Sequence, residues 1–169
     1  VGISTITSTA PRAYTIADQV REMQIPVIMG GPHVSYLPEE ALEHADFVFR
    51  GEAENALPKF IEQWSNGGDF STVPNLSYQN NGKIFHNMLG ELITDLDTIP
   101  YPDLSLIQNG LRRAFGFRTI PIQTSRGCPF NCEFCSVTGM FGKKLRYRST
   151  ENIIKELPHA HDKKNDRHI

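Results

Sequence analysis

The chain has 169 residues, of which 39% are hydrophobic and 21% charged, so composition predicts an ordinary folded protein of one domain or parts of two. Its formal net charge of −2 gives no electrostatic argument for nucleic acid or an anionic membrane as a partner. No run of about 18 apolar residues is present, which excludes a transmembrane segment. Because no basic-then-apolar leader opens the chain, we expect a cytoplasmic protein.

The ends of the sequence predict that it is a piece of a longer protein. Val1 is not a methionine, and it lies directly inside an expected strand. Three strands are few for a doubly wound sheet, so one or two further strands are expected before Val1.

The first third of the chain alternates between two hydrophobic periodicities. Short β-branched or aromatic runs predict strands, and apolar residues at helical spacing predict helices. The expected strands are residues 1–6, 26–29 and 47–50, and the expected helices are residues 13–23, 38–44 and 52–64. This order is typical of βαβ units and predicts an α/β fold with a Rossmann-like parallel sheet.

The middle of the chain no longer alternates between strand and helix patterns. Residues 75–78 and 83–86 flank Asn80-Asn81-Gly82, which predicts a hairpin with a tight turn. Residues 92–103 contain two prolines and are expected to form an extended linker. A further strand is expected over residues 118–124. A last helix is expected over residues 150–159, with Ser149 as its N-cap.

All three cysteines lie in one short stretch, TSRGCPFNCEFCSVTG, residues 124–139. An odd number of cysteines without a leader argues for a reducing compartment and for ligands rather than disulfides. Cys128, Cys132 and Cys135 could hold a zinc ion with a distant histidine, for which the candidates are His86, His159 and His161. They could instead hold three irons of a [4Fe–4S] cluster and leave the fourth iron open.

The segment RGCPFNCEFCS, residues 126–136, follows an expected strand and precedes Tyr147-Arg148-Ser149. Its CxxxCxxC spacing, with an aromatic residue before the last cysteine, resembles the signature of the radical S-adenosylmethionine (SAM) enzymes. The resemblance implies that Cys128, Cys132 and Cys135 bind a [4Fe–4S] cluster, that SAM binds the open iron, and that Phe134 contacts its adenine. It also implies reductive cleavage of SAM to a 5′-deoxyadenosyl radical.

A glycine pair ends the second expected strand, in VIMGGPHVS, residues 27–35. Glycines at this place allow a ligand to approach the backbone closely. The order of Ser4, Gly30-Gly31 and then Gly51-Glu52-Ala53-Glu54 resembles the cobalamin-binding domain that precedes many radical SAM domains. By this resemblance Ser4, Gly30 and Gly31 line a cobalamin pocket, and His33 lies on its rim.

Two sets of charged residues have plainer explanations. Glu52 and Glu54 are expected in the first turn of a helix, where carboxylates offset the helix dipole. A basic run after the cysteines is most simply a solvated face, and it consists of Lys143, Lys144, Arg146 and Arg148. Arg148 is the exception, which is expected instead to stabilise the loop or to meet an anionic group.

The two resemblances together predict three regions. Residues 1–66 would be the C-terminal half of a Rossmann-like cobalamin-binding domain, and residues 67–117 a hairpin with an extended linker. Residues 118–169 would be the first βα unit of a radical SAM partial TIM barrel, with the cysteine loop at the carboxyl end of its first strand.

The resulting hypothesis is a cobalamin-dependent radical SAM enzyme that methylates an unactivated carbon of a small molecule such as a lipid or a secondary metabolite. Flavodoxin or ferredoxin would supply electrons. Three alternatives stay open: ring formation, rearrangement or oxidation without methyl transfer, a non-catalytic zinc-binding module, and a cobalamin sensor with a structural cysteine loop.

Overall fold

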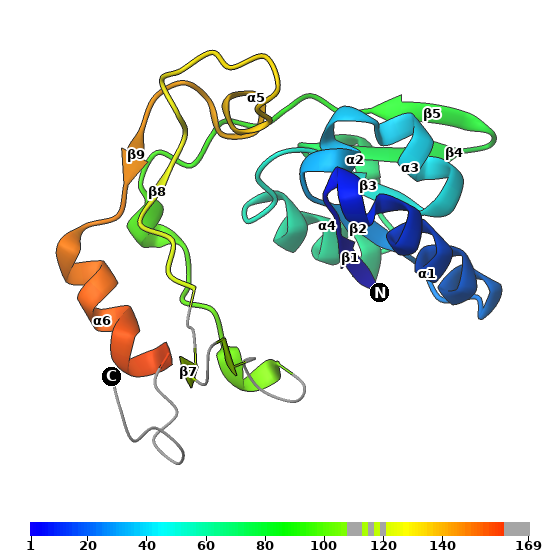
Figure 1. Cartoon of the computed structure of the whole chain (residues 1–169). Helices are drawn as coiled ribbons and strands as arrows, with labels where there is room; N and C mark the ends of the chain where they lie inside the picture. Colours follow the sequence, from blue (N-terminus) through cyan, green and yellow to red (C-terminus); the bar gives the residue numbers. More distant parts are fainter. Residues whose placement is uncertain (108–112, 115–116, 119–120, 161–169) are drawn as a thin grey trace. The chain divides into compact units, whose positions relative to one another are not determined.

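The computed structural model describes residues 1–107, 113–114, 117–118 and 121–160, drawn in Figure 1. The chain forms two compact units, and each is discontinuous in sequence. Unit 1 comprises Val1–Ile93 and Gly127–Lys143, and unit 2 comprises the described parts of Thr94–Arg126 and Lys144–Ile169. The cysteine loop therefore belongs to the same unit as the first 93 residues.

Unit 1 is built on one five-stranded sheet with the strand order β1-β2-β3-β4-β5. The pairings of β1 with β2 and of β2 with β3 are parallel, as the Rossmann-like prediction requires, and the two others are antiparallel. The strands are β1 (Gly2–Ser4), β2 (Ile28–Gly30), β3 (Phe47–Phe49), β4 (Leu76–Asn80) and β5 (Lys83–His86). The predicted hairpin is confirmed, and it extends the sheet because Leu76 and Tyr78 are buried against the side chains of β3.

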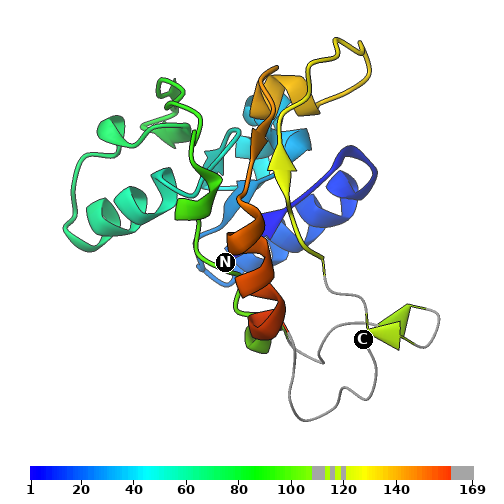
Figure 2. The same ribbon diagram turned by 90° about the vertical axis from the view of Figure 1, so that its left-hand side faces the viewer.

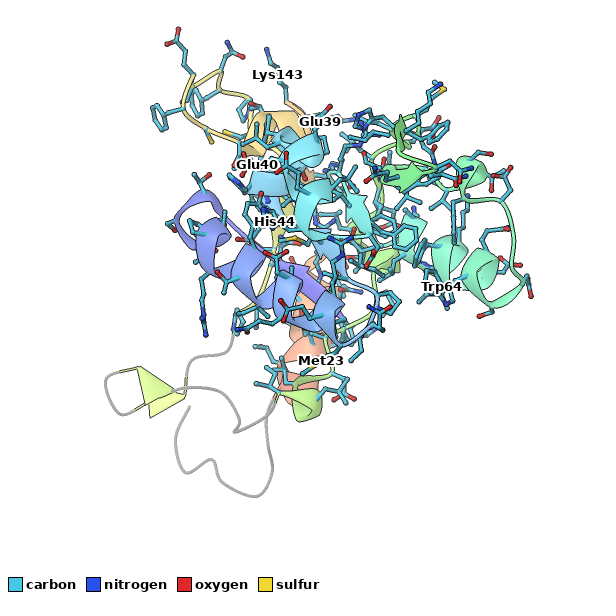
Figure 3. All side chains as sticks on the ribbon, turned by 90° about the vertical axis from the view of Figure 1, so that its right-hand side faces the viewer. Met23, Glu39, Glu40, His44, Trp64 and Lys143 are labelled. Atoms are coloured by element: carbon cyan, nitrogen blue, oxygen red, sulfur yellow. The ribbon has the colours of Figure 1, made fainter. Side chains whose placement is uncertain are left out.

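Helices cover both faces of this sheet. The core on one face includes side chains of α1 (Ala10–Glu22), α2 (Pro32–Tyr36) and α3 (Pro38–His44), which is the helix that carries Glu39, Glu40 and His44 in Figure 3. The other face packs against α4 (Ala56–Ser65). Small residues such as Ala13, Ala17 and Ala41 bring the first set of helices close to β2 and β3.

An aromatic cluster fills the face under α4. Phe47 of β3 meets Phe60 edge-on at 4.8 Å between ring centroids, and Phe60 stacks on Phe70 at 5.3 Å. Trp64, labelled in Figure 3, borders this cluster and is 46% exposed. Alternating residues of β3 thus serve two cores, since Val48 points to the opposite face.

Two short helices were not expected from the sequence. They are α2, which begins at Pro32 directly after the glycine pair, and α5 (Val137–Phe141), which follows the cysteines. Both are five residues long, below the length at which hydrophobic periodicity is informative. Every helix among the described residues is too short or too polar to cross a bilayer.

Unit 2 contains the strand pair β8 (Ser125–Arg126) and β9 (Arg146–Tyr147), which leads into α6 (Thr150–Ala160), as Figure 2 shows. The last helix and its N-cap are confirmed, because Ser149 Oγ accepts a hydrogen bond from the Asn152 amide at 3.1 Å. The strand before the cysteines begins later than predicted, since residues 121–124 pair with no strand in the described chain and residues 119–120 lie outside it.

The other short elements of unit 2 are two 3-10 turns, η3 (Leu96–Thr98) and η4 (Leu104–Leu106), and the strand pair of β6 (Arg113–Ala114) with β7 (Phe117–Arg118). The segment predicted to be an extended linker contains η3. Leu96 in that turn is 1% exposed, so its burial supplies the energy that orders the turn.

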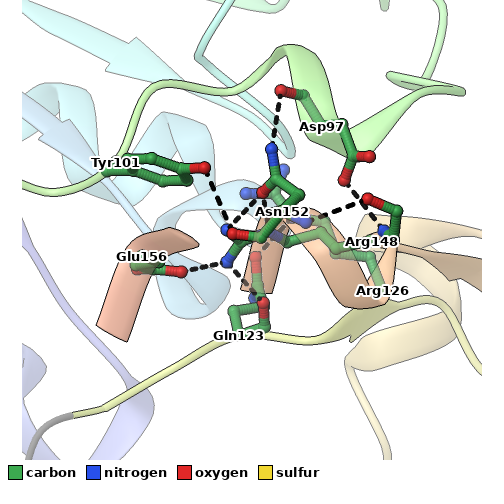
Figure 4. A network of polar contacts seen from close by, with 8 residues as sticks. Asp97, Tyr101, Gln123, Arg126, Arg148, Asn152 and Glu156 are labelled. Carbon is green, nitrogen blue, oxygen red and sulfur yellow. Dashed lines mark hydrogen bonds and ion pairs between the residues drawn. The ribbon is translucent and has the colours of Figure 1, made fainter. Parts of the chain in front are cut away.

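Arg148 fastens α6 to the segment that precedes β8, in the network of Figure 4. Its Nη1 donates to the Gln123 carbonyl at 3.0 Å and pairs with the Glu156 carboxylate, and its Nε donates to Asn152 Oδ1 at 2.9 Å. The Arg148 and Glu156 side chains are 9% and 5% exposed. These contacts stabilise unit 2, and the two roles expected for Arg148 at the cysteine loop stay predictions.

Replacing Arg148 tests this network. Removing one partner of a buried ion pair leaves the other charge uncompensated, so R148M is expected to destabilise unit 2 by about 3–5 kcal/mol. Hydrogen exchange at the α6 amides of the full-length protein measures the effect. The matched change R12M removes an exposed arginine of α1 and is expected to shift stability by no more than about 0.5 kcal/mol. Equal exchange in both variants would contradict the assignment.

Candidate cofactor site at the carboxyl edge of the sheet

The carboxyl ends of β1 and β2 bring together the residues predicted for a ligand pocket. Ser4 is the register partner of Gly30, and the amide of Thr5 donates to the Gly30 carbonyl at 3.0 Å. In open α/β sheets, ligands bind outside the carboxyl ends of such strands. Ser4 and the glycine pair thus lie side by side at the edge where the fold places a ligand.

The two glycines differ in how much space surrounds them. Gly31 has φ 97° and ψ 177°, a backbone conformation that only glycine adopts readily. A Cβ there would lie 2.7 Å from the Thr5 carbonyl oxygen and 2.9 Å from Ser4 Oγ. At Gly30 the nearest atom to an added Cβ is the Phe49 carbonyl oxygen at 4.0 Å, so that position has room. Gly31 is therefore required by the fold, whereas Gly30 is half-buried and leaves room beside Ser4.

Ser35 joins the glycine pair to the end of β3, a role that the sequence did not suggest. Its hydroxyl donates to the Gly31 carbonyl at 2.8 Å and accepts from the Gly51 amide at 3.0 Å. The ends of β2 and β3 are thereby held at a fixed spacing.

His33 borders a cleft, and its predicted place on the rim of a cobalamin pocket stays a prediction. Its Nδ1 is 3.2 Å from Thr7 Oγ1, and its Nε2 is 3.3 Å from a Glu40 carboxylate oxygen. The side chain is only 9% exposed. Because both ring nitrogens are engaged, His33 braces the turn after β1 against α3 in this structure and does not present a nitrogen to a metal.

Glu52 has a different role from the one expected. α4 begins at Ala56, so Glu52 and Glu54 lie before the helix and not in its first turn. Glu52 is 7% exposed, and its carboxylate accepts from the Ile93 amide at 2.9 Å. Its carbonyl accepts from the Asn75 side chain. The helix-dipole prediction is wrong for Glu52, because a buried backbone amide provides a stronger local partner.

The cysteine loop is part of unit 1, and backbone hydrogen bonds close it into a compact turn. The Cys128 amide donates to the Gly142 carbonyl at 3.1 Å, which closes the base of the loop. The Cys135 amide donates to the Cys132 carbonyl at 3.1 Å, which forms the inner turn. Gly127 and Gly142 have φ of 89° and 78°, so the tight reversals at both ends of the loop use glycine.

The three sulfurs are free thiols, and Cys132 is exposed. Within the described part of the chain, no three His, Cys, Asp or Glu side chains gather around one point as a single metal ion requires. Thiolates bound to three separate irons of a cube need not converge on one point, so this arrangement gives no support to zinc and leaves the cluster prediction untested. His86, a proposed zinc ligand, contacts Ser77 and Glu39 through its two ring nitrogens, and His161 lies outside the described residues.

A cleft of about 580 Å³ lies between the helix that follows the glycine pair and the cysteine loop. One wall contains Thr7, Pro32 and His33, and the other contains Phe134 and Cys135. This volume lies within the range of about 300–1,000 Å³ that is typical of small-molecule sites. The cleft therefore brings the two motifs recognised in the sequence to one place.

Aromatic side chains stand out into solvent on the loop. Phe134 is 93% exposed and Phe130 is 70% exposed. Exposed aromatic rings beside free thiols indicate a surface that a ligand or another part of a protein covers.

A family model described as the B12 binding domain matches residues 1–61, which include Ser4, the glycine pair and His33. An uncharacterized methyltransferase of Pyrococcus horikoshii is 38% identical over 166 residues, 95% of this chain and 36% of that protein. Bacteriochlorophyllide d C-8(2)-methyltransferase of Chlorobaculum tepidum is 34% identical over 160 residues, 95% of this chain and 33% of that protein. The chain thus spans about a third of the length of these relatives.

The fold is also found in a solved structure, that of the cobalamin-dependent S-adenosylmethionine radical enzyme OxsB with aqua-cobalamin and S-adenosylmethionine bound. The TM-score is 0.74 at 22% identity, over 94% of this chain and 22% of that one. This likeness confirms the predicted Rossmann-like α/β fold.

Replacing Gly31 tests whether the turn after β2 has to lie directly against the backbone of Thr5. G31A is expected to lower the free energy of unfolding by roughly 2–6 kcal/mol, because backbone strain costs about 1–3 kcal/mol and overpacking about as much again. Chemical denaturation of the full-length protein measures this change. The control is G2A, whose added Cβ meets nothing within 4 Å. If G31A were as stable as G2A, the Thr5 contact would not matter.

Proposed function

We propose that the chain is part of an enzyme that methylates an unactivated carbon. Three findings support this: the B12 binding domain model matches residues 1–61, two relatives are methyltransferases, and the fold is that of a cobalamin-dependent radical SAM enzyme. The enzyme would bind cobalamin, a [4Fe–4S] cluster and SAM. Its substrate would be a small molecule, such as a lipid or a secondary metabolite. Methyl transfer is favoured because both relatives named above are methyltransferases.

The donor set supports a [4Fe–4S] cluster. Cys128, Cys132 and Cys135 are uncombined thiols on one closed loop, and thiolates are the ligands by which proteins hold such clusters. Three ligands leave one iron for SAM. When bound, the reduced cluster would supply the electron that cleaves the sulfonium of SAM, and Phe134 would offer its exposed ring to the adenine.

The strand ends support a cobalamin site. Gly30 leaves room, and Ser4 is exposed beside it as a hydroxyl donor and acceptor. When bound, cobalamin would carry the transferred methyl group. Gly31 and Ser35 would act indirectly, by fixing the strand ends on which the ligand rests.

The observation that carries the proposal is the shared cleft. A methyl group passes between two reactants only if both are held close together, and positioning is a large part of catalysis. The cleft has the turn after Gly31 on one wall and Phe134 with Cys135 on the other. An electron donor such as flavodoxin or ferredoxin would approach the exposed side of the loop, near Cys132.

Anaerobic reconstitution with iron and sulfide tests the cluster. The full-length protein is expected to gain broad absorption near 400 nm, and C132A is expected to lose most of it because one of three ligands is gone. N131A, which changes a residue of the same loop that has no thiol, is the control. Incorporation of one zinc and no iron would contradict the proposal. Cleavage of SAM without methylated product would favour the alternative of ring formation, rearrangement or oxidation.

Replacing Gly30 tests the cobalamin site without disturbing the fold. G30A is expected to fold normally, because its Cβ meets no atom closer than 4.0 Å in the free protein. Hydroxocobalamin would meet that methyl group, so its dissociation constant should rise roughly fivefold or more, as overpacking of about 1–3 kcal/mol implies. Equilibrium titration by absorbance measures the change. Unchanged affinity, with G2A as reference, would place the ligand elsewhere.

A further inference from the structure

We propose that Tyr36 is a positioning residue that couples the glycine-pair edge of the sheet to the cysteine loop, so that the cluster strengthens the binding of cobalamin. This inference rests on the proposed function, since it needs both cofactors. Tyr36 lies in neither of the motifs by which the sequence was interpreted. Its importance emerges from contacts that join segments about 100 residues apart in the chain.

Tyr36 makes a hydrogen bond between the two segments. It is the last residue of α2, the helix that begins at Pro32 directly after Gly31. Its hydroxyl donates to the Ser136 carbonyl at 3.0 Å. Ser136 immediately follows Cys135, so a single hydrogen bond spans from the helix after the glycine pair to the residue after the last cysteine.

Gly139 provides the space for this contact. A Cβ at Gly139 would lie 1.9 Å from the Tyr36 hydroxyl oxygen and 2.9 Å from its Cζ. Gly139 is the third of five residues in α5, and glycine in a helix interior is destabilising by roughly 1 kcal/mol relative to alanine. A glycine in this place is explained by the close approach of the tyrosine ring.

The contact is not needed to fill the core. Tyr36 is 53% exposed, whereas Met140 on the same short helix α5 is 7% exposed and provides its apolar anchorage. Removing the hydroxyl of an exposed tyrosine leaves a ring of the same shape and no buried unpaired atom at position 36. A change in cofactor binding on its removal would therefore not follow from loss of the fold.

The coupling follows because each cofactor, when bound, restricts the motion of the segment that holds it. A cluster held by Cys135 would restrict the position of the neighbouring Ser136 carbonyl. Because the Tyr36 hydroxyl is hydrogen-bonded to that carbonyl, the position of α2 would be restricted as well. Cobalamin at the strand ends then meets a helix that is already held, so less conformational entropy is lost on binding. By linkage, the cluster and cobalamin raise each other's affinity by the same factor.

The test is a titration of the full-length protein with hydroxocobalamin, with and without the reconstituted cluster. In the wild type we expect the cluster to lower the dissociation constant by about two- to tenfold, which is the worth of one such hydrogen bond. In Y36F, that ratio should fall to about one while the affinity of the cluster-free protein stays unchanged. Cluster absorption checks that both proteins are loaded equally.

Two further variants separate the contact from a general effect. G139A pushes the Tyr36 hydroxyl away and should lower the ratio as Y36F does, and the double variant should lose no more than either single one. Y101F is the matched control, because it removes a tyrosine hydroxyl that donates to the Asn152 carbonyl at 3.1 Å in unit 2. It should keep the wild-type ratio.

Each outcome is decisive. A wild type that binds neither cofactor overturns the proposed function. A wild type that binds both without coupling, or a Y36F protein that keeps the wild-type ratio, overturns the role of Tyr36 and leaves the proposed function standing. Loss of the ratio in Y101F as well would also overturn that role, since the effect would then not be specific to the contact.

Discussion

The contact between Gly31 and the backbone of Thr5 is the constraint on which the carboxyl edge of the sheet depends. With no side chain in between, the turn after β2 lies directly against the end of β1. This approach sets the place of Ser4, starts α2 at Pro32, and puts the Gly31 carbonyl within reach of Ser35. A methyl group at this one position would separate the ends of β1 and β2.

A second constraint is the return of the cysteine loop to unit 1. The loop is closed by backbone bonds at its base and held through α5, where Met140 is buried. Cys135 and the helix that follows the glycine pair thereby border one cleft. The two short helices α2 and α5 each bury one apolar side chain, Val34 and Met140, and their remaining residues form the turns beside the two motifs.

Local patterns in the sequence predicted much of this fold. Periodicity predicted α1, α3, α6 and the parallel strands, and Asn81-Gly82 predicted the hairpin, because each signal is contained within a few residues. The contacts of Tyr36 and Glu52 could not be predicted in this way. Their partners, Ser136 and Ile93, are 100 and 41 residues distant, and only the folded chain brings them together. The cysteine spacing indicated a ligand set, but not which part of the chain the loop would contact.

The central claim is that cobalamin and the iron–sulfur cluster share one cleft. Electron paramagnetic resonance of the full-length protein tests it directly, since cob(II)alamin and a reduced [4Fe–4S] cluster each carry an unpaired spin. If the claim is right, the protein that holds both centres gives signals broadened by their mutual magnetic interaction, compared with protein that holds either one alone. A spectrum equal to the sum of the two separate spectra would show that the centres lie far apart and would contradict the account.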